Sequence, residues 1–80
     1  MAVTVVFLGK LADLANAPEM MLGAPLDWGG LLAALPEHLR DAVQADTTRL
    51  AINGELLTDK SALAAKEGDE IALLPPVSGG

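Results

Sequence analysis

Two short, mainly apolar runs constrain the fold of this chain most strongly: AVTVVFL at residues 2–8 and EIALL at residues 70–74. The first run is β-branched and aromatic with almost no polar residue, which is typical of a central strand. The second run ends at Pro75, because proline has no N–H to donate to a sheet ladder. We therefore expect these two strands to be neighbours at the middle of a mixed sheet.

The segment from residue 27 to residue 44 carries the pattern of two short helices. Asp27 is well placed to cap a helix from Trp28 to Leu35, because a carboxylate there accepts from free backbone N–H groups. Pro36 then fits the first turn of a second helix, where its missing N–H does no harm. The two helices share a stripe of apolar residues, four apart, that can cover one face of the sheet: Leu31, Leu35, Leu39 and Val43.

The remaining segments complete the order of elements. A short helix or helical turn is expected within residues 9–17, and a short strand within residues 19–26. The pair Asn53-Gly54 lies between two apolar runs, and this pair favours the tight turn of a β-hairpin. A further helical turn is expected within residues 61–70.

This order of elements predicts an α+β fold of the β-grasp, or ubiquitin-like, type. Its mixed sheet has four to five strands, with the helices packed on one face. We predict a single β-grasp domain over residues 1–74 and a flexible, extended C-terminal tail over residues 75–80.

Composition removes several classes of function. The chain has no cysteine and one histidine, His38, so no thiolate or histidine cluster can hold a metal, and we expect no bound cofactor. The net charge of −6 should repel phosphate backbones and favour basic surfaces on protein partners, so we expect no nucleic-acid binding. The first apolar run is too short for a membrane span and lacks a basic leader. We therefore expect a cytoplasmic protein without membrane contact.

The tail, PPVSGG, is the one segment whose composition points to chemistry. Two prolines stiffen the exit from the sheet, and the six residues reach about 20 Å when fully extended. Glycine at position 80 leaves the terminal carboxyl group open to attack, because no side chain crowds it. A free α-carboxyl group has a reference pKa of about 3.5, so it is ionised at neutral pH and is a poor electrophile. It needs activation by another protein, because the chain has no nucleotide-binding loop.

The ending ALLPPVSGG, preceded by EGDEIA, resembles that of the MoaD/ThiS family of ubiquitin-like sulfur carriers. The runs VTVVFLGKLADLA and RLAINGELL also fall where that family has its first strand and helix and its hairpin, so the resemblance covers the whole chain. Within the family, the Pro-Pro-Val-Ser-Gly-Gly ending is most similar to that of molybdopterin synthase small subunits.

The resemblance implies a sulfur-donating subunit with no catalytic site of its own. A ubiquitin-activating-type adenylyltransferase would use ATP and Mg to adenylate the carboxylate of Gly80, and a sulfur relay would convert it to a thiocarboxylate. The tail would enter the large subunit of molybdopterin synthase and pass sulfur to cyclic pyranopterin monophosphate, building the molybdopterin dithiolene. The complex would be a heterotetramer of two large and two small subunits. The other tail residues would contact the channel or keep the tail slim: Pro75, Pro76, Val77, Ser78 and Gly79.

An apolar patch beside the tail is the predicted meeting point for both partners. Many family members have aromatic residues just before the two prolines, where this chain has Leu73 and Leu74. Apolar character is kept, but the stacking area is smaller. We place Leu74 in the patch together with Leu8 and Leu56, and ordinary core packing is the alternative for each of them.

Two other functions stay open at this point. The chain could deliver sulfur to a different acceptor, such as thiamin thiazole, tRNA or a sulfur-containing amino acid. It could also be a β-grasp protein-binding module with no chemistry at its end.

Overall fold

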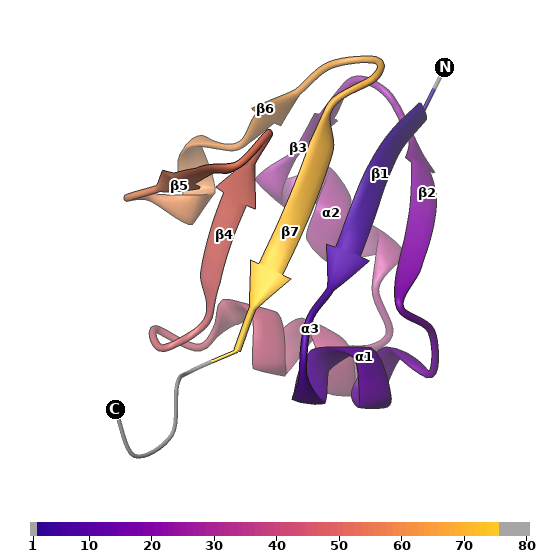
Figure 1. Ribbon diagram of the computed structural model, residues 1–80, viewed down its shortest axis with the longest axis vertical. Coiled ribbons are helices and arrows are strands. Elements are labelled where there is room, and N and C mark those ends of the chain that lie inside the picture. The colour runs from indigo at the N-terminus through magenta and orange to yellow at the C-terminus, as the bar shows by residue number, and fades with distance from the viewer. Residues whose placement is uncertain (1, 76–80) are drawn as a thin grey trace.

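The two apolar end runs pair with each other at the middle of a five-stranded sheet (Figure 1). The structure, a computed structural model, describes residues 2–75. Strand β1 (Ala2–Phe7) runs parallel to β7 (Glu70–Leu74), with Val5 opposite Ile71 in the register. This pairing confirms the predicted central neighbours and the mixed character of the sheet.

The outer strands flank this pair on both sides in the order β2-β1-β7-β4-β5. Strand β2 (Glu19–Gly23) is antiparallel to β1, and β4 (Arg49–Ile52) is antiparallel to β7. Strand β5 (Glu55–Leu57) completes the predicted hairpin with β4. Both turn residues of that hairpin have positive φ angles, 51° at Asn53 and 86° at Gly54, which is the conformation that Asn-Gly favours.

Helices α2 (Trp28–Ala34) and α3 (Glu37–Gln44) lie on one side of the sheet, and α1 (Lys10–Ala15) lies at its lower end, just beyond β1. The Asp27 carboxylate caps α2 as predicted, since its Oδ1 accepts from the Gly30 N–H at 2.7 Å. Pro36 lies one position earlier than expected, at the N-cap of α3 rather than in its first turn, because its ψ of 158° is extended. The predicted stripe is buried in full: Leu31, Leu35, Leu39 and Val43.

The prediction for residues 61–70 was wrong in most of its length. Only a short 3₁₀ turn, η1 (Lys60–Ala62), forms there, and it is followed by strand β6 (Ala64–Ala65). Strand β6 pairs with β3 (Leu26–Asp27) in a separate two-stranded sheet. An extended backbone lets Leu63 and Ala65 face the core together, which a helix at these positions would not do.

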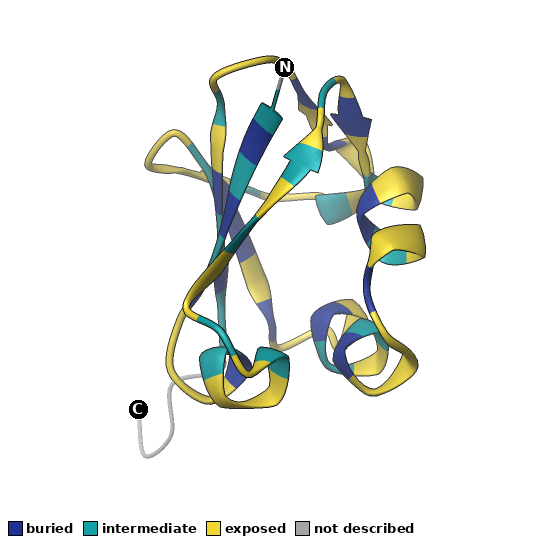
Figure 2. Ribbon diagram, turned by 90° about the vertical axis from the view of Figure 1, so that its right-hand side faces the viewer, coloured by how far each residue is buried: buried dark blue, intermediate teal, exposed yellow. Residues whose placement is uncertain are grey.

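The five-stranded sheet therefore has one covered face and one open face (Figure 2). The covered face, packed against the helices, carries the buried side chains of β1 and β7: Val3, Val5, Phe7, Ile71 and Leu73. No helix or strand in residues 2–75 lies over the opposite face. We call the following residues on that side the open face: Thr4, Val6, Glu19, Met21, Arg49, Ala51, Leu56, Glu70, Ala72 and Leu74.

None of the helices within residues 2–75 has both the length and the apolar character that crossing a membrane requires.

Candidate functional site

The candidate site begins where β7 ends, at the root of the C-terminal tail. The Leu8 N–H donates to the Leu73 carbonyl oxygen at 3.1 Å, which extends the pairing of the central strands beyond the end of β1. Pro75, the first residue of the predicted tail, follows directly and is half-buried. The predicted site residues beyond it lie outside the residues that the structure describes: Pro76, Val77, Ser78, Gly79 and Gly80.

Gly9 is part of this root, and the sequence interpretation missed it. Its φ angle of 53° lies in the left-handed region, and a Cβ atom built there would stand 3.0 Å from Pro75 Cγ. A side chain at position 9 would therefore be strained by its backbone and crowded by the proline ring. The turn between β1 and α1 accepts Pro75 because residue 9 is glycine, and this contact fixes where the chain leaves the sheet.

The three residues of the predicted apolar patch lie on the same side of the sheet. Leu74 is half-buried next to Pro75, and Leu8 is 40% exposed just beyond the end of β1. Leu56 is 64% exposed on the edge strand β5, one row of residues farther from the tail. The row containing Leu56 continues across the sheet through small and β-branched side chains: Ala51, Ala72 and Val6.

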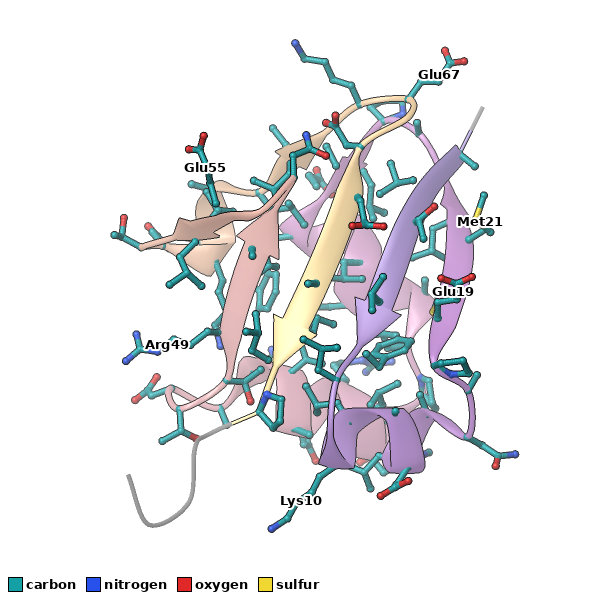
Figure 3. The ribbon with its side chains drawn as sticks, in the orientation of Figure 1. Lys10, Glu19, Met21, Arg49, Glu55 and Glu67 are labelled. Atoms are coloured by element: carbon teal, nitrogen blue, oxygen red, sulfur yellow. The ribbon has the colours of Figure 1, made fainter. Side chains whose placement is uncertain are left out.

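Met21 adds to this surface at the opposite edge of the sheet and was not predicted. It is 62% exposed on β2, opposite Thr4 in the register, and the Thr4 hydroxyl lies 3.3 Å from its sulfur (Figure 3). The sequence EMML does not by itself show which face of the sheet Met21 occupies. That face is known only from the register of β2 with β1. The open face thus exposes large apolar side chains at both edges and beside the tail root.

A shallow polar depression, which Arg49 of β4 also lines, contains Lys60, whose ammonium group is occupied by hydrogen bonds within the fold. Its Nζ donates to three backbone carbonyl oxygens, those of Val43 at 2.8 Å, Ala45 at 2.7 Å and Thr48 at 2.8 Å. It also lies 5.7 Å from the centroid of the Trp28 ring, and partial burial lowers the pKa of the ammonium. An ammonium has three N–H donors, so none is left for a ligand or a reaction.

His38, the one histidine, is exposed on α3. Its Nε2 lies 3.1 Å from the Leu14 carbonyl oxygen near the end of α1. A carbonyl oxygen only accepts, so this ring nitrogen carries the proton and ties the two helices together. The contact gives His38 a structural place away from the tail root.

Comparison with known proteins places the chain among proteins of similar size. The ThiS family profile matches residues 5–80. The molybdopterin synthase sulfur carrier subunit of Drosophila erecta is 35% identical over 81 residues, which cover 98% of this chain and 90% of that protein.

Two solved structures share the fold over 100% of both chains. One is a chain in the complex of subunits 1 and 2 of the molybdopterin-converting factor from Helicobacter pylori, at 32% identity with a TM-score of 0.69. The other is small archaeal modifier protein 1 of Haloferax volcanii, at 26% identity with a TM-score of 0.72. These likenesses confirm the β-grasp fold. The profile match over residues 5–80 and the similarity to the Drosophila erecta subunit show that the chain belongs to the ThiS family.

Proposed function

We propose that this chain is the sulfur-carrier small subunit of a molybdopterin synthase and works in the cytoplasm. The observation that carries the proposal is the near full-length similarity to a sulfur carrier subunit, together with a Gly-Gly ending that residues 75–78 separate from Leu74 on the open face. The Helicobacter pylori relative is part of a two-subunit complex, which supports a large-subunit partner for this chain as well.

The proposed chemistry takes place at the carboxylate of Gly80. A ubiquitin-activating-type adenylyltransferase, with ATP and Mg, joins this carboxylate to AMP and releases pyrophosphate. The acyl adenylate is a good electrophile, so a sulfur nucleophile at the level of hydrosulfide displaces AMP and leaves a thiocarboxylate. The loaded tail then enters the large subunit and gives its sulfur to cyclic pyranopterin monophosphate. Because a dithiolene contains two sulfur atoms, each molybdopterin consumes two loaded chains.

The fold contributes placement rather than catalytic groups to this chemistry. Pro75 packs against Gly9 at the start of the tail, so the tail begins from a fixed point beside the open face. The partner would bind that face and bury three side chains that are now exposed or half-buried: Leu8, Leu56 and Leu74. Docking of this face would deliver the tail into the partner's channel, in a complex of two large and two small subunits.

Intact mass spectrometry after co-expression with the activating enzyme and a sulfur source tests the loading step. We expect a mass gain equal to one sulfur replacing one oxygen at the C-terminus. A chain lacking Gly80 still ends in glycine, so it tests tail length, whereas Gly80→Ala tests the need for a bare terminal residue. Both variants should load poorly. An unchanged mass for the natural chain, with full activity in the chain lacking Gly80, would refute the proposal.

The archaeal neighbour favours one other candidate function, because it is a modifier protein. In that case the activated carboxyl group of Gly80 would form an amide bond with an amine of a target protein, releasing AMP. The same loading mixture distinguishes the two functions. A carrier gives only the thiocarboxylate mass, whereas a modifier gives covalent conjugates whose mass is the sum of both proteins less one water.

A further inference from the structure

The five Lys and Arg side chains of this acidic chain fall into two groups, one hydrogen-bonded within the fold and one exposed. Arg40 and Lys60 are turned inward: the Arg40 guanidinium donates to the carbonyl oxygens of Leu32 and Leu35, and Lys60 donates to three others. Lys10, Arg49 and Lys66 are exposed, and the structure records no side-chain hydrogen bond or ion pair for them within residues 2–75. These three are the cations that remain for contact with another molecule.

Two of the three exposed cations stand on either side of the tail root (Figure 3). Arg49, the first residue of β4, is the register partner of Leu74, so it lies beside the residue that precedes Pro75. Lys10 follows Gly9, the residue that Pro75 contacts on the other side. Asp46 lines the same depression as Arg49 without forming an ion pair with it among the described residues. The side chains of Lys10 and Arg49 point outward in different directions around the root.

The carboxylates of the open side lie farther from the tail. Glu19 is one row away from the Arg49 row, opposite Val6, and Glu70 is a further row away, opposite Thr4. Glu67 lies at the end of the molecule opposite to Lys10 in the view of Figure 3. Along the rows of the sheet, Glu19 and Glu70 therefore lie farther from the tail root than Arg49 does. The carboxylates nearest the two cations are outside these rows: Asp46 lines the same depression as Arg49, and Asp13 lies three residues after Lys10 in α1.

We infer that Lys10 and Arg49 form a cationic rim that pairs with carboxylates around the mouth of the channel in the large subunit. The inference rests on the proposed function. It adds that the large subunit carries acidic groups at one place on its surface, which the net charge of this chain does not predict. An overall charge of −6 favours a basic partner surface, whereas the rim requires acidic groups at one place on it. Opposite signs at the two ends of the face also fix the orientation in which it docks.

The length of the tail indicates whether the rim binds a protein carboxylate or a phosphate. Five residues separate Pro75 from the terminal carboxyl group, which amounts to about 17 Å in an extended chain. A tail extended into a channel holds the reacting carboxyl group, with any nucleotide or pterin phosphate beside it, far beyond the reach of Lys10 or Arg49. The surface next to the rim is then the channel mouth.

Three charge-reversal variants distinguish the effect of the rim on binding from the effect of net charge: Lys10→Glu, Arg49→Glu and Lys66→Glu. Each takes the net charge from −6 to −8, but Lys66 lies beyond β6, at the end of the molecule away from the tail. Each variant is used with its C-terminus as the carboxylate, before sulfur loading. Its dissociation constant and association rate with purified large subunit are measured at low and high salt. We expect Lys10→Glu and Arg49→Glu each to raise the dissociation constant about tenfold, mainly through slower association, with a smaller effect at high salt. Lys66→Glu should change it less than about twofold.

The inference is overturned if all three variants weaken binding equally, since net charge alone would then explain the effect, or if the two rim variants bind as well as the natural chain. Lys10→Arg and Arg49→Lys should restore binding, and unchanged thermal unfolding midpoints show that each variant is folded. An effect confined to loading by the activating enzyme would also overturn it, because the rim would then serve the other partner. Failure of the natural chain to load or deliver sulfur contradicts the proposed function instead and leaves the binding comparison to stand on its own.

Discussion

The two faces of the sheet are made by the same strands and yet have different tasks. On β7, Ile71 and Leu73 are fully buried against the helices, while the alternating residues Ala72 and Leu74 are only half-buried on the open face. Burial of the first set stabilises the fold, because apolar area leaves water during folding itself. The second set stays partly wet until a partner covers it. Under the proposed function, β7 therefore serves folding with one face and association with the other.

The largest expected effect is on stability and comes from the covered face. Ile71→Ala leaves a cavity in the core and should lower the free energy of unfolding by about 2–5 kcal/mol. Leu74→Ala, on the same strand but on the open face, should lower it by less than about 1 kcal/mol, because its side chain is already partly hydrated. Urea unfolding followed by circular dichroism measures both. Equal losses would show that the two faces do not differ as described.

The next effect is on association and comes from the open face. Leu74→Ala should weaken binding to the large subunit by about 1–2 kcal/mol, because this residue adjoins the tail root, where the interface is expected to be driest. Leu56→Ala, one row farther away, should cost less. Met21→Ala is the control, since Met21 is equally exposed but on the far edge of the sheet. Titration calorimetry should give the order Leu74, Leu56, Met21, and the reverse order would move the interface to the β2 edge.

Gly9 lies next to Pro75, where the tail leaves the sheet, and so links the sheet to the tail. Gly9→Ala should cost about 1 kcal/mol of stability, through its positive φ angle and the crowding of Pro75. It should also raise the KM for loading by the activating enzyme, because the tail root is displaced. Gly23→Ala is the matched control, since a Cβ atom there meets nothing within 4 Å. If the loading KM is the same for both variants, the contact with Pro75 does not position the tail.

The smallest effect concerns acid stability, at the end of the sheet away from the tail. The backbone N–H of Lys66 and the side-chain amide of Asn53 both donate to Asp69, and they hold its pKa below the ordinary value of 3.8. A lowered folded-state pKa stabilises the fold above that ordinary value, and the benefit is lost as the pH falls through the folded-state pKa. Asp69→Asn should therefore flatten the loss of stability below about pH 4. Affinity for the large subunit at neutral pH should not change, and a change would place this turn in the interface.

Elements with strong local signals were predictable from the sequence. The Asn53-Gly54 turn, the Asp27 cap and the stripe from Leu31 to Val43 each follow from residues close together in the chain, and all three are present. The short pairing of β3 with β6 was missed, because two-residue strands far apart in sequence carry no local signal. An alanine-rich segment after residue 60 then favoured a helical turn by default.

The candidate site divides in the same way. The terminal glycines and the leucines at positions 8, 56 and 74 could be named from sequence, because their composition and neighbours are unusual. Gly9 and Arg49 could not, since their importance depends on lying beside Pro75 and Leu74. That proximity is a consequence of the parallel and antiparallel register around β7, which no run of residues encodes by itself.

The claim that this fold presents a sulfur-bearing terminus to a partner is tested most directly in a single turnover. Purified thiocarboxylated chain is mixed with the large subunit and cyclic pyranopterin monophosphate, and the mass of the chain is followed together with dithiolene formation. We predict that the thiocarboxylate returns to the carboxylate at two chains per molybdopterin, and only when both other components are present. A thiocarboxylate that persists in the complete mixture, or that is lost without product, would contradict the account.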